Sequence, residues 1–298
     1  MNSIILQVNG LSKQYKDVKA LDNLDLQVEQ GTVFGLLGPN GSGKTTTLGI
    51  LLGVIKQKSG NYSWFGNNDA TENRKKIGAL LETPNFYPYL SAVRNLEIVA
   101  KIKNIDNPTS QIESVLKEVN LLERKNSKFR TFSLGMKQRL AIASTLLGDP
   151  EILVLDEPTN GLDPQGIAEI RELILKIAKN DKTIIIASHI LDEIEKVCSH
   201  VAILKFGKLI KQGTIDEIIG DENYIIVASK DMIKMTQIID SNENIDVFKA
   251  SERELIIKVD KDMTAEDVNQ FFFDKGLVLS QLKVYTQSLE TQFLEIIK

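Results

Sequence analysis

The sequence predicts an α/β fold followed by a smaller α+β domain, and three observations lead to that prediction. Continuous apolar runs, typical of buried parallel strands, alternate with helical patterns over the first 220 residues. A glycine-rich loop stands between one of these strands and the next helix. The composition shifts near Gly213–Asp221, and beyond it the patterns follow the order strand, helix, strand, strand, helix, strand. We therefore expect domains at residues 1–220 and 221–298.

The first domain is expected to contain strands of two kinds. Leu24–Val28 alternates apolar and polar residues, as a half-buried strand does, whereas Ile152–Leu155 and Thr183–Ala187 are continuous apolar runs. Ser110 with Glu113 has the pattern of a capping box at a helix start. The other elements expected are strands at Ser3–Val8, Val33–Leu37, Asn61–Gly66, Val201–Leu204 and Lys208–Gln212, the last two forming a hairpin, and helices opening at Thr45 and over Ser91–Lys103.

The second domain has the pattern of a small α+β fold. Thr264 with Asp267 predicts a capped helix start, and the aromatic run Phe271–Phe273 is expected in the core. Strands are expected at Tyr224–Ala228, Ile245–Ala250, Glu254–Val259 and Val278–Val284, and the other helices at Asp231–Asp240 and Leu289–Ile297.

Composition and charge are those of an ordinary globular protein. The 298 residues include 42% hydrophobic and 26% charged side chains, with a formal net charge of −4. Residues 221–298 carry 15 acidic and 9 basic side chains, which argues against a surface there for nucleic acid or anionic lipid. No apolar run approaches about 18 residues, and no basic start precedes an apolar stretch, so we expect neither a membrane span nor a secretory signal. The single cysteine, Cys198, excludes an internal disulfide and fits a reducing cytosol.

The most informative motif is Gly38–Thr45, called the phosphate loop below, which reads Gly-Pro-Asn-Gly-Ser-Gly-Lys-Thr. It matches G-x-x-x-x-G-K-[ST] between a strand and a helix, the context of a nucleotide site. Glycines let backbone N–H groups turn towards phosphate oxygens, and the helix N-terminus adds positive charge. Lys44 supplies a charge for the β- and γ-phosphates, and the Thr45 hydroxyl can ligate Mg²⁺. The residues expected to contact the nucleotide are Gly38, Pro39, Asn40, Gly41, Ser42, Gly43, Lys44, Thr45 and Thr46.

An acidic pair supplies the second half of the site. Asp156 and Glu157 directly follow the apolar run Ile152–Leu155. Asp156, at the carboxyl end of a buried strand, can hold Mg²⁺ directly or through water. Glu157 is then placed to orient and deprotonate an attacking water, and a positioned general base is worth roughly 10²–10⁴-fold in rate.

With these motifs, residues 3–220 resemble the ATP-binding cassette (ABC) ATPases. Ser133-Leu134-Gly135-Met136-Lys137-Gln138-Arg139 is similar to that family's LSGGQ signature, and Gly161-Leu162-Asp163-Pro164 matches its D-loop. His189 matches the switch histidine, and Tyr15 stands where the family carries an aromatic that stacks on adenine. The resemblance implies a P-loop NTPase fold with a RecA-like core, an antiparallel β subdomain and an α-helical signature subdomain.

The resemblance also implies how the parts work together. Two cassettes, as a homodimer or a pair, face each other head to tail with two ATP molecules and Mg²⁺ between them. Ser133 and Gly135 of one copy close over the γ-phosphate of ATP on the phosphate loop of the other. His189 contacts that phosphate, and Asp163 links the two sites across the interface.

The chain departs from the family pattern in two places. In the signature, Leu134 replaces a glycine and Met136 replaces a glutamine, so we expect the contacts from Ser133 and Gly135 alone. Glu82 stands where the family usually has a glutamine that touches Mg²⁺ and the attacking water, in the cleft that receives the membrane partner. A carboxylate can ligate metal but, when ionised, cannot donate a hydrogen bond. We therefore expect Glu82 at the metal and hypothesise that it tunes hydrolysis or coupling.

A narrower resemblance concerns the phrase Glu-Thr-Pro-Asn-Phe-Tyr-Pro at residues 82–88. With the signature, it is similar to the cassettes of bacterial exporters for bacitracin and for lantibiotic self-immunity. That resemblance implies an ATPase subunit held peripherally at the cytoplasmic face of the cell membrane. It also implies an integral membrane permease encoded separately and a peptide-antibiotic substrate.

The main alternative is a soluble, non-transport ABC ATPase acting on a ribosome or DNA complex. The ribosome type usually carries two tandem cassettes, whereas this chain has one phosphate loop. The DNA type inserts a long coiled coil, but only 112 positions separate Lys44 from Asp156, without sustained heptads. Intact Glu157 and His189 disfavour a regulatory module that binds ATP without turnover. An assignment as a small-molecule kinase or GTPase would not explain the stretch Ser133–Arg139, which is similar to the ABC signature.

Overall fold

The computed structural model describes residues 3–67, 70–82, 85–220, 223–242, 245–260, 262–285 and 288–296. The chain divides into two compact units, with the boundary between Ile215 and Asp216. That boundary lies inside the stretch where the composition shifts, and the domain limits at residues 220 and 221 stay a prediction. No helix of the described residues has the length and apolar character needed to cross a membrane.

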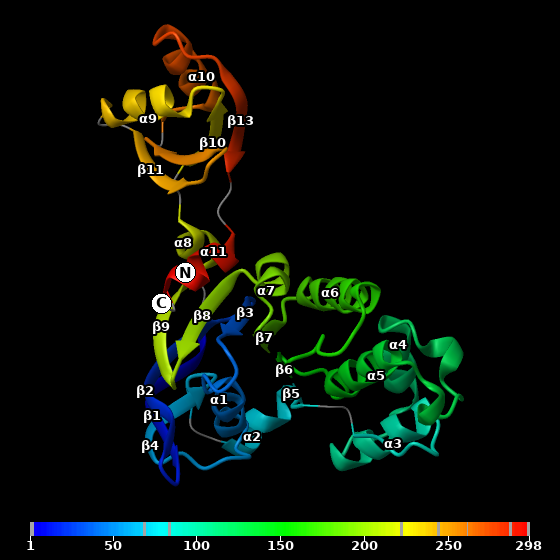
Figure 1. Ribbon diagram of the computed structural model, residues 1–298. Coiled ribbons are helices and arrows are strands. Elements are labelled where there is room, and N and C mark those ends of the chain that lie inside the picture. Colours follow the sequence, from blue (N-terminus) through cyan, green and yellow to red (C-terminus); the bar gives the residue numbers. More distant parts are fainter. Residues whose placement is uncertain are drawn as a thin grey trace. The chain divides into compact units, whose positions relative to one another are not determined.

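A six-stranded sheet forms the centre of the first unit (Figure 1). Five strands run parallel and the last is antiparallel. The middle strands are buried along their whole length, which explains their continuous apolar sequences. In spatial order the strands are β5 (Ile77–Leu80), β6 (Ile152–Asp156), β7 (Thr183–Ser188), β3 (Val33–Leu37), β8 (His200–Lys205) and β9 (Lys208–Thr214).

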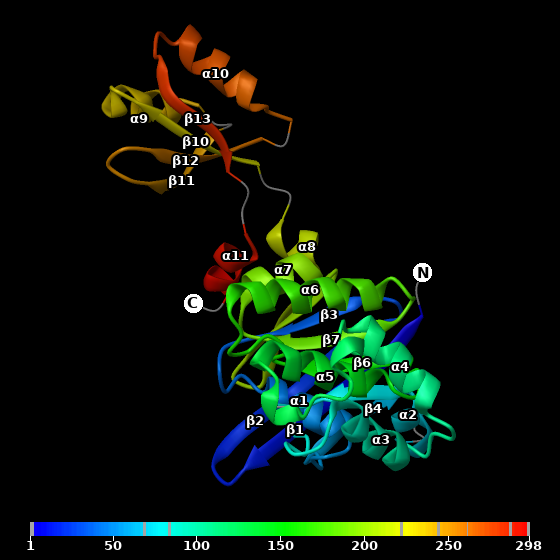
Figure 2. The same cartoon turned by 90° about the vertical axis from the view of Figure 1, so that its right-hand side faces the viewer.

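Helices cover both faces of this sheet (Figure 2). Phe34 and Leu36 of β3 belong to the core that includes α1 (Lys44–Leu51). Gly35 faces the other way, where an added Cβ would lie 2.7 Å from Ile194 of α7 (Leu191–Val197). The glycine therefore lets α7 pack directly on β3. The other helices of the sheet region are α2 (Ala70–Lys75) and α6 (Pro164–Ala178), and the short helix α8 (Ile215–Ile219) spans the boundary between the two units.

A three-stranded antiparallel sheet packs into the same core, in the order β2 (Val18–Glu29), β1 (Ile4–Tyr15) and β4 (Ser59–Trp64). The strands predicted at Ser3–Val8 and Leu24–Val28 are therefore only parts of two 12-residue strands. Register shifts and positive φ angles, 58° at Gly10 and 53° at Asn23, interrupt the apolar alternation that the prediction used.

A helical region lies between β5 and β6 in the chain. It consists of α3 (Ala92–Ile102), α4 (Thr109–Glu118) and α5 (Leu134–Leu146), with short 3₁₀ turns at Leu122–Arg124 and Phe129–Thr131. Ser91 caps α3 by accepting a hydrogen bond from the Arg94 N–H at 3.3 Å. The capping box predicted at Ser110 is wrong, because α4 begins after Pro108 without a side-chain cap.

The second unit is a four-stranded antiparallel sheet with helices and a core of its own. The capping box of Thr264 and Asp267 is confirmed. The expectation that all of Phe271–Phe273 is core is wrong, because Phe272 is fully buried and Phe273 is 65% exposed. The elements are β10 (Asn223–Ser229), α9 (Met232–Asp240), β11 (Ile245–Ala250), β12 (Leu255–Val259), α10 (Ala265–Asp274), β13 (Leu279–Tyr285) and α11 (Leu289–Ile296).

Candidate functional site

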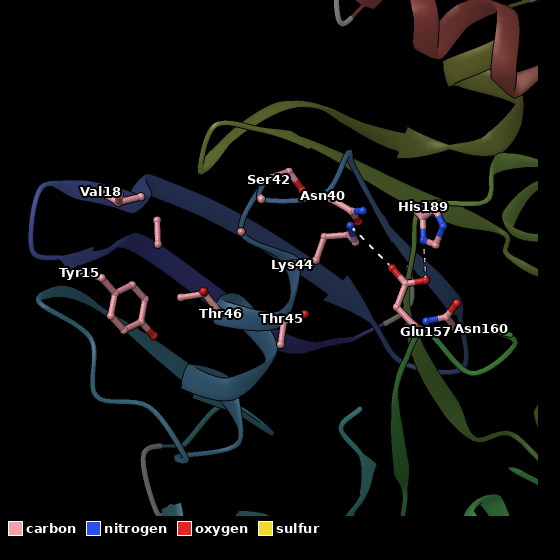
Figure 3. Close-up of a pocket in the computed structure, with 13 residues that line it drawn as sticks. Tyr15, Val18, Asn40, Ser42, Lys44, Thr45, Thr46, Glu157, Asn160 and His189 are labelled. Carbon is pink, nitrogen blue, oxygen red and sulfur yellow. Dashed lines mark hydrogen bonds and ion pairs between the residues drawn. The ribbon is translucent and has the colours of Figure 1, made fainter. Parts of the chain in front are cut away.

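The phosphate loop joins β3 to α1 at the carboxyl edge of the central sheet (Figure 3). Its glycines are required by close backbone contacts. A Cβ on Gly38 would lie 2.4 Å from the Leu204 carbonyl oxygen, and one on Gly43 would lie 2.7 Å from that of Ala20. Gly41 and Gly43 also have φ angles of 80° and 107°, which L side chains rarely adopt. The loop is therefore held in one shape by the strands around it.

Lys44 is a buried cation inside this loop. Only 6% of the residue is exposed, and its ammonium donates to the carbonyl oxygens of Gly38 at 2.7 Å and Pro39 at 3.4 Å. Burial lowers the pKa of Lys44, and the negative charges of Glu157 and Asp156 oppose that shift. An anion in the loop would therefore find a cation already in place.

A pocket of about 520 Å³ opens beside the loop. Tyr15 and Val18 form an exposed apolar wall at one end, and Glu157 and His189 lie at the other (Figure 3). The ammonium of Lys13 lies 4.9 Å from the Tyr15 ring centroid. The phosphate loop lies between an apolar wall that suits a planar base and a polar end. The lining residues are Tyr15, Val18, Ala20, Asn40, Gly41, Ser42, Gly43, Lys44, Thr45, Thr46, Glu157, Asn160 and His189.

Asp156 is a buried carboxyl at the end of β6 and is 2% exposed. Burial raises its pKa, the hydrogen bond from Thr45 opposes that rise, and the nearby charge of Glu82 adds to it. Its Oδ1 atom has no hydrogen-bond partner in the structure. A buried carboxylate oxygen left open beside a threonine hydroxyl fits a hard cation such as Mg²⁺. Among the described residues no group of three or more His, Cys, Asp or Glu side chains could hold a metal ion.

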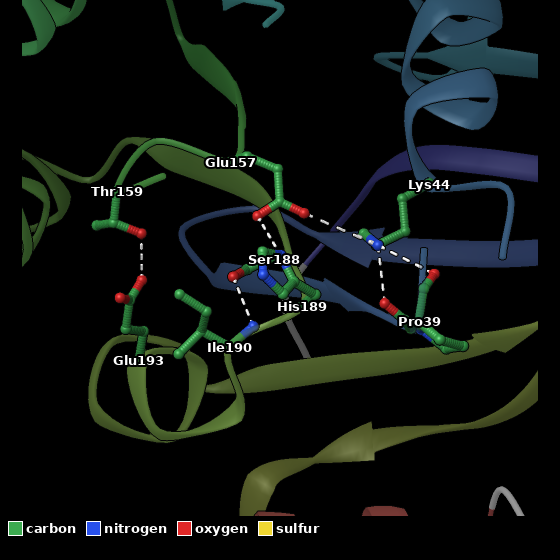
Figure 4. Close-up of polar contacts among 9 residues, drawn as sticks. Pro39, Lys44, Glu157, Thr159, Ser188, His189, Ile190 and Glu193 are labelled. Atoms are coloured by element: carbon green, nitrogen blue, oxygen red, sulfur yellow. Dashed lines mark hydrogen bonds and ion pairs between the residues drawn. The ribbon is translucent and has the colours of Figure 1, made fainter. Parts of the chain in front are cut away.

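Glu157 and His189 form a contact pair from neighbouring loops (Figure 4). The Nδ1 atom of His189 lies 2.8 Å from Oε2 of Glu157. A carboxylate only accepts hydrogen bonds, so Nδ1 is the donor and Nε2 of the 41% exposed imidazole is left for a ligand. The other carboxylate oxygen, Oε1, lies 3.8 Å from the Lys44 ammonium. The pair can therefore act on a water molecule placed beside a phosphate bound at Lys44.

Seven predicted site residues are not among those that line this pocket. Three of them, Gly38, Pro39 and Asp156, belong to the phosphate loop and to the end of β6 described above, and the other four lie farther from the loop. Ser133 caps α5 by accepting from the Met136 N–H at 3.2 Å, and Asp163 caps α6 by accepting from the Gly166 N–H at 2.9 Å. Gly135 stands at an open surface, because an added Cβ would meet nothing within 4 Å. Glu82 is exposed, with a φ of 58°, and approaches the site only through its charge effect on Asp156. A single copy of the chain therefore brings together only some of the predicted site residues.

Three residues that line the pocket were not predicted: Val18, Ala20 and Asn160. Val18 and Ala20 lie on β2, beyond the turn that follows Tyr15, so the neighbourhood of Tyr15 was the available signal. Asn160 closes the turn after Glu157, with its N–H donating to the Glu157 carbonyl oxygen at 3.1 Å. Its position shortly after the acidic pair of Asp156 and Glu157 was the feature of the sequence that could have indicated it.

Comparisons with known proteins identify the family of the chain. The ABC transporter family model matches residues 21–160. The chain is 39% identical to the bacitracin transport ATP-binding protein BcrA of Bacillus licheniformis, over 99% of this chain and 98% of that protein. It is 38% identical to the lantibiotic transport ATP-binding protein SrtF of Streptococcus pyogenes, over 74% of this chain and 93% of the relative. A dimeric, post-hydrolysis ATP-binding cassette, MJ0796 bound to ADP and Pi, superposes with a TM-score of 0.63 and 26% identity, covering 71% and 99% of the two chains. The chain therefore belongs to the ABC transporter family, as one of its ATP-binding, ATP-hydrolysing subunits.

Proposed function

We propose that this chain supplies the ATPase activity of an exporter that removes a peptide antibiotic through a separate membrane permease. The full-length similarity to a bacitracin transport protein supports the class of substrate. The contact of Glu157 with His189 beside the phosphate loop is the observation that carries the hydrolytic part. We place the chain peripherally, at the cytoplasmic face of the cell membrane, where such a permease would hold it.

Each site residue has a defined task in this proposal. Lys44 and the backbone N–H groups of the phosphate loop bind the β- and γ-phosphates. Thr45 and Asp156 hold Mg²⁺, which would neutralise charge developing on the phosphate oxygens. Glu157 takes a proton from the attacking water. His189 orients Glu157 by donating from Nδ1 and, when its imidazole carries a proton on each nitrogen, donates from Nε2 to the γ-phosphate. Tyr15 stacks on the adenine base.

A second copy of the chain completes the site. Ser133 is exposed and Gly135 half-buried at the start of α5, and neither lines the pocket of its own copy. The N-terminus of a helix attracts anions, so this surface suits the γ-phosphate of ATP bound by a partner copy. Glu82 stays a candidate metal and coupling residue, and Asp163 a candidate link between the two sites.

A groove beside α3 is the proposed docking site of the permease. Its volume is about 420 Å³, and Phe86, Tyr87 and Ile102 are among its lining residues, the last 74% exposed. Asn95, 1% exposed, fixes one wall by accepting from the Tyr87 N–H at 2.8 Å and donating to the carbonyl oxygens of Tyr87, Leu90 and Ser91. A groove lined mostly by aromatic and aliphatic side chains suits a short helix of a membrane protein.

Purification of the tagged chain from gently solubilised native membranes tests the exporter. We expect one multi-span integral membrane protein at near-equal stoichiometry. We also expect a strain without this chain to become sensitive to bacitracin or a lantibiotic, and the Glu157→Gln variant to leave it sensitive. Recovery of ribosomal or DNA-repair proteins with nothing from the membrane would refute the exporter and favour a soluble ABC ATPase.

A further inference from the structure

A second, buried contact joins the two loops that carry Glu157 and His189. The Thr159 hydroxyl, two residues after Glu157, donates to Oε2 of Glu193, four residues after His189 (Figure 4). Thr159 is 5% exposed and Glu193 is 9% exposed, and neither lines the nucleotide pocket. The segments that follow β6 and β7 therefore share two side-chain contacts, one at the pocket between Glu157 and His189 and one outside it between Thr159 and Glu193 of α7.

Burial of the Glu193 carboxyl is costly for the fold. Burial raises the pKa of Glu193, with the hydrogen bond from Thr159 opposing the rise. The second oxygen, Oε1, is buried without any hydrogen-bond partner in the structure. An apolar side chain of similar size would avoid that cost, so stability alone does not account for the carboxyl.

The backbone of Glu157 shows what the contact could maintain. Glu157 has a φ of 48°, in the left-handed region that non-glycine residues rarely adopt. Such a conformation persists only where its surroundings hold it. The Glu157 N–H donates to the Ala187 carbonyl oxygen at 2.9 Å and the Asn160 N–H donates to the Glu157 carbonyl oxygen at 3.1 Å. Among side chains near this turn, Glu193 holds Thr159 from the helix α7 that follows His189.

We propose that Glu193 is a positioning residue for ATP hydrolysis, which holds Thr159 and thereby keeps Glu157 in its strained backbone conformation and in contact with His189. The proposal rests on the roles assigned above to Glu157 and His189. Loss of the contact would let the turn relax and would move the Glu157 carboxylate away from the attacking water. A displacement of about 1 Å can reduce a rate by about 10²-fold. ATP binding, which uses the phosphate loop and Tyr15, would be spared.

Steady-state ATPase kinetics of the purified chain test this role. We expect Glu193→Met and Thr159→Val each to lower kcat by roughly tenfold or more, with KM for ATP within about twofold of wild type. The double variant should lose no more than either single one, because both remove the same contact. Glu193→Gln and Thr159→Ser, which keep an acceptor and a donor, should recover most of kcat.

Thr183→Val is the matched control. Thr183 is fully buried and its hydroxyl accepts one hydrogen bond, from the Gly31 N–H at 2.9 Å, at the opposite end of β7. We expect this variant to lower Tm and leave kcat unchanged. If Thr159→Val behaves like Thr183→Val, or if the losses of Thr159→Val and Glu193→Met multiply in the double variant, the positioning role is refuted. If Glu193→Met fails to fold, the comparison of kcat between Thr159→Val and Thr159→Ser tests the positioning role.

Glu157→Gln, assayed in parallel, separates this inference from the proposed function. Near-normal hydrolysis in that variant would remove the general base on which the inference depends. An inactive Glu157→Gln beside a fully active Glu193→Met would refute only the positioning role of Glu193.

Discussion

The ammonium of Lys44 lies 3.8 Å from the Glu157 carboxylate, across the polar end of the nucleotide pocket. The phosphate loop holds this ammonium, so we expect the γ-phosphate of ATP to bind beside it, next to the proposed general base Glu157. A phosphate bound at Lys44 would compete with Glu157 for the ammonium, which would free Oε1 for a water molecule while Oε2 keeps its contact with His189. We therefore expect substitution at Glu157 to change hydrolysis more than ATP affinity.

Glu157→Gln should keep ATP affinity and lose most hydrolysis. The amide cannot accept a proton, and it no longer neutralises Lys44. Kd for ATP should stay within a few-fold of wild type, while kcat falls by roughly 10²-fold or more. Size-exclusion chromatography with ATP should show an accumulated dimer. Near-normal turnover would remove Glu157 as the base.

Asp156→Asn should stabilise the nucleotide-free protein while removing Mg²⁺-dependent hydrolysis. Burial raises the pKa of Asp156 above its ordinary value of 3.8, so the unfolded state releases this proton first as pH rises. Through the window between 3.8 and the raised pKa, this group lowers the stability of the folded state, and it stays unfavourable at pH 7. The neutral amide avoids that cost, and a gain of about 1 kcal/mol corresponds to roughly 2–4 °C in Tm. A scanning calorimetry trace with a lower Tm at pH 7 would contradict this account.

Glu82→Gln should change the rate of hydrolysis or its coupling to the permease. Glu82 raises the pKa of Asp156 through its charge, so the neutral amide removes a negative charge near the proposed Mg²⁺ ligands and should shift the Mg²⁺ concentration that gives half-maximal hydrolysis. The ATPase rate against Mg²⁺ concentration, with and without the permease, measures both effects. An unchanged rate together with unchanged coupling would show that the carboxylate is merely tolerated.

Ile102→Glu should disrupt docking of the permease. Ile102 is 74% exposed and lines the proposed docking groove, where a charge would meet an apolar helix. Val54→Glu is the matched control, because Val54 is 71% exposed and does not line that groove. We expect several-fold less permease to copurify with Ile102→Glu and wild-type recovery with Val54→Glu. Equal recovery from both variants would place the docking surface elsewhere.

Local sequence determined the parts of the site that a single strand and loop can build. The phosphate loop, Lys44, Asp156 and Glu157 follow directly from motifs whose residues are neighbours in the chain. Buried strands were recognisable because both of their faces are apolar, as in β6 and β7. Strands that contain residues with positive φ angles were predicted only in part, because Gly10 and Asn23 interrupt the alternation of apolar and polar residues along β1 and β2.

Only the tertiary structure decided which distant residues meet. Glu157 contacts His189 and Thr159 contacts Glu193 because β6 and β7 are parallel neighbours, an arrangement that local patterns do not specify. In the same way, Phe273 is exposed and Phe272 buried because α10 turns one face to its sheet. Sequence alone determined the chemistry of this protein, through residue types at short spacing. Tertiary structure decided its geometry, because burial and pairing depend on strand order and on helix faces that come together only in the folded chain.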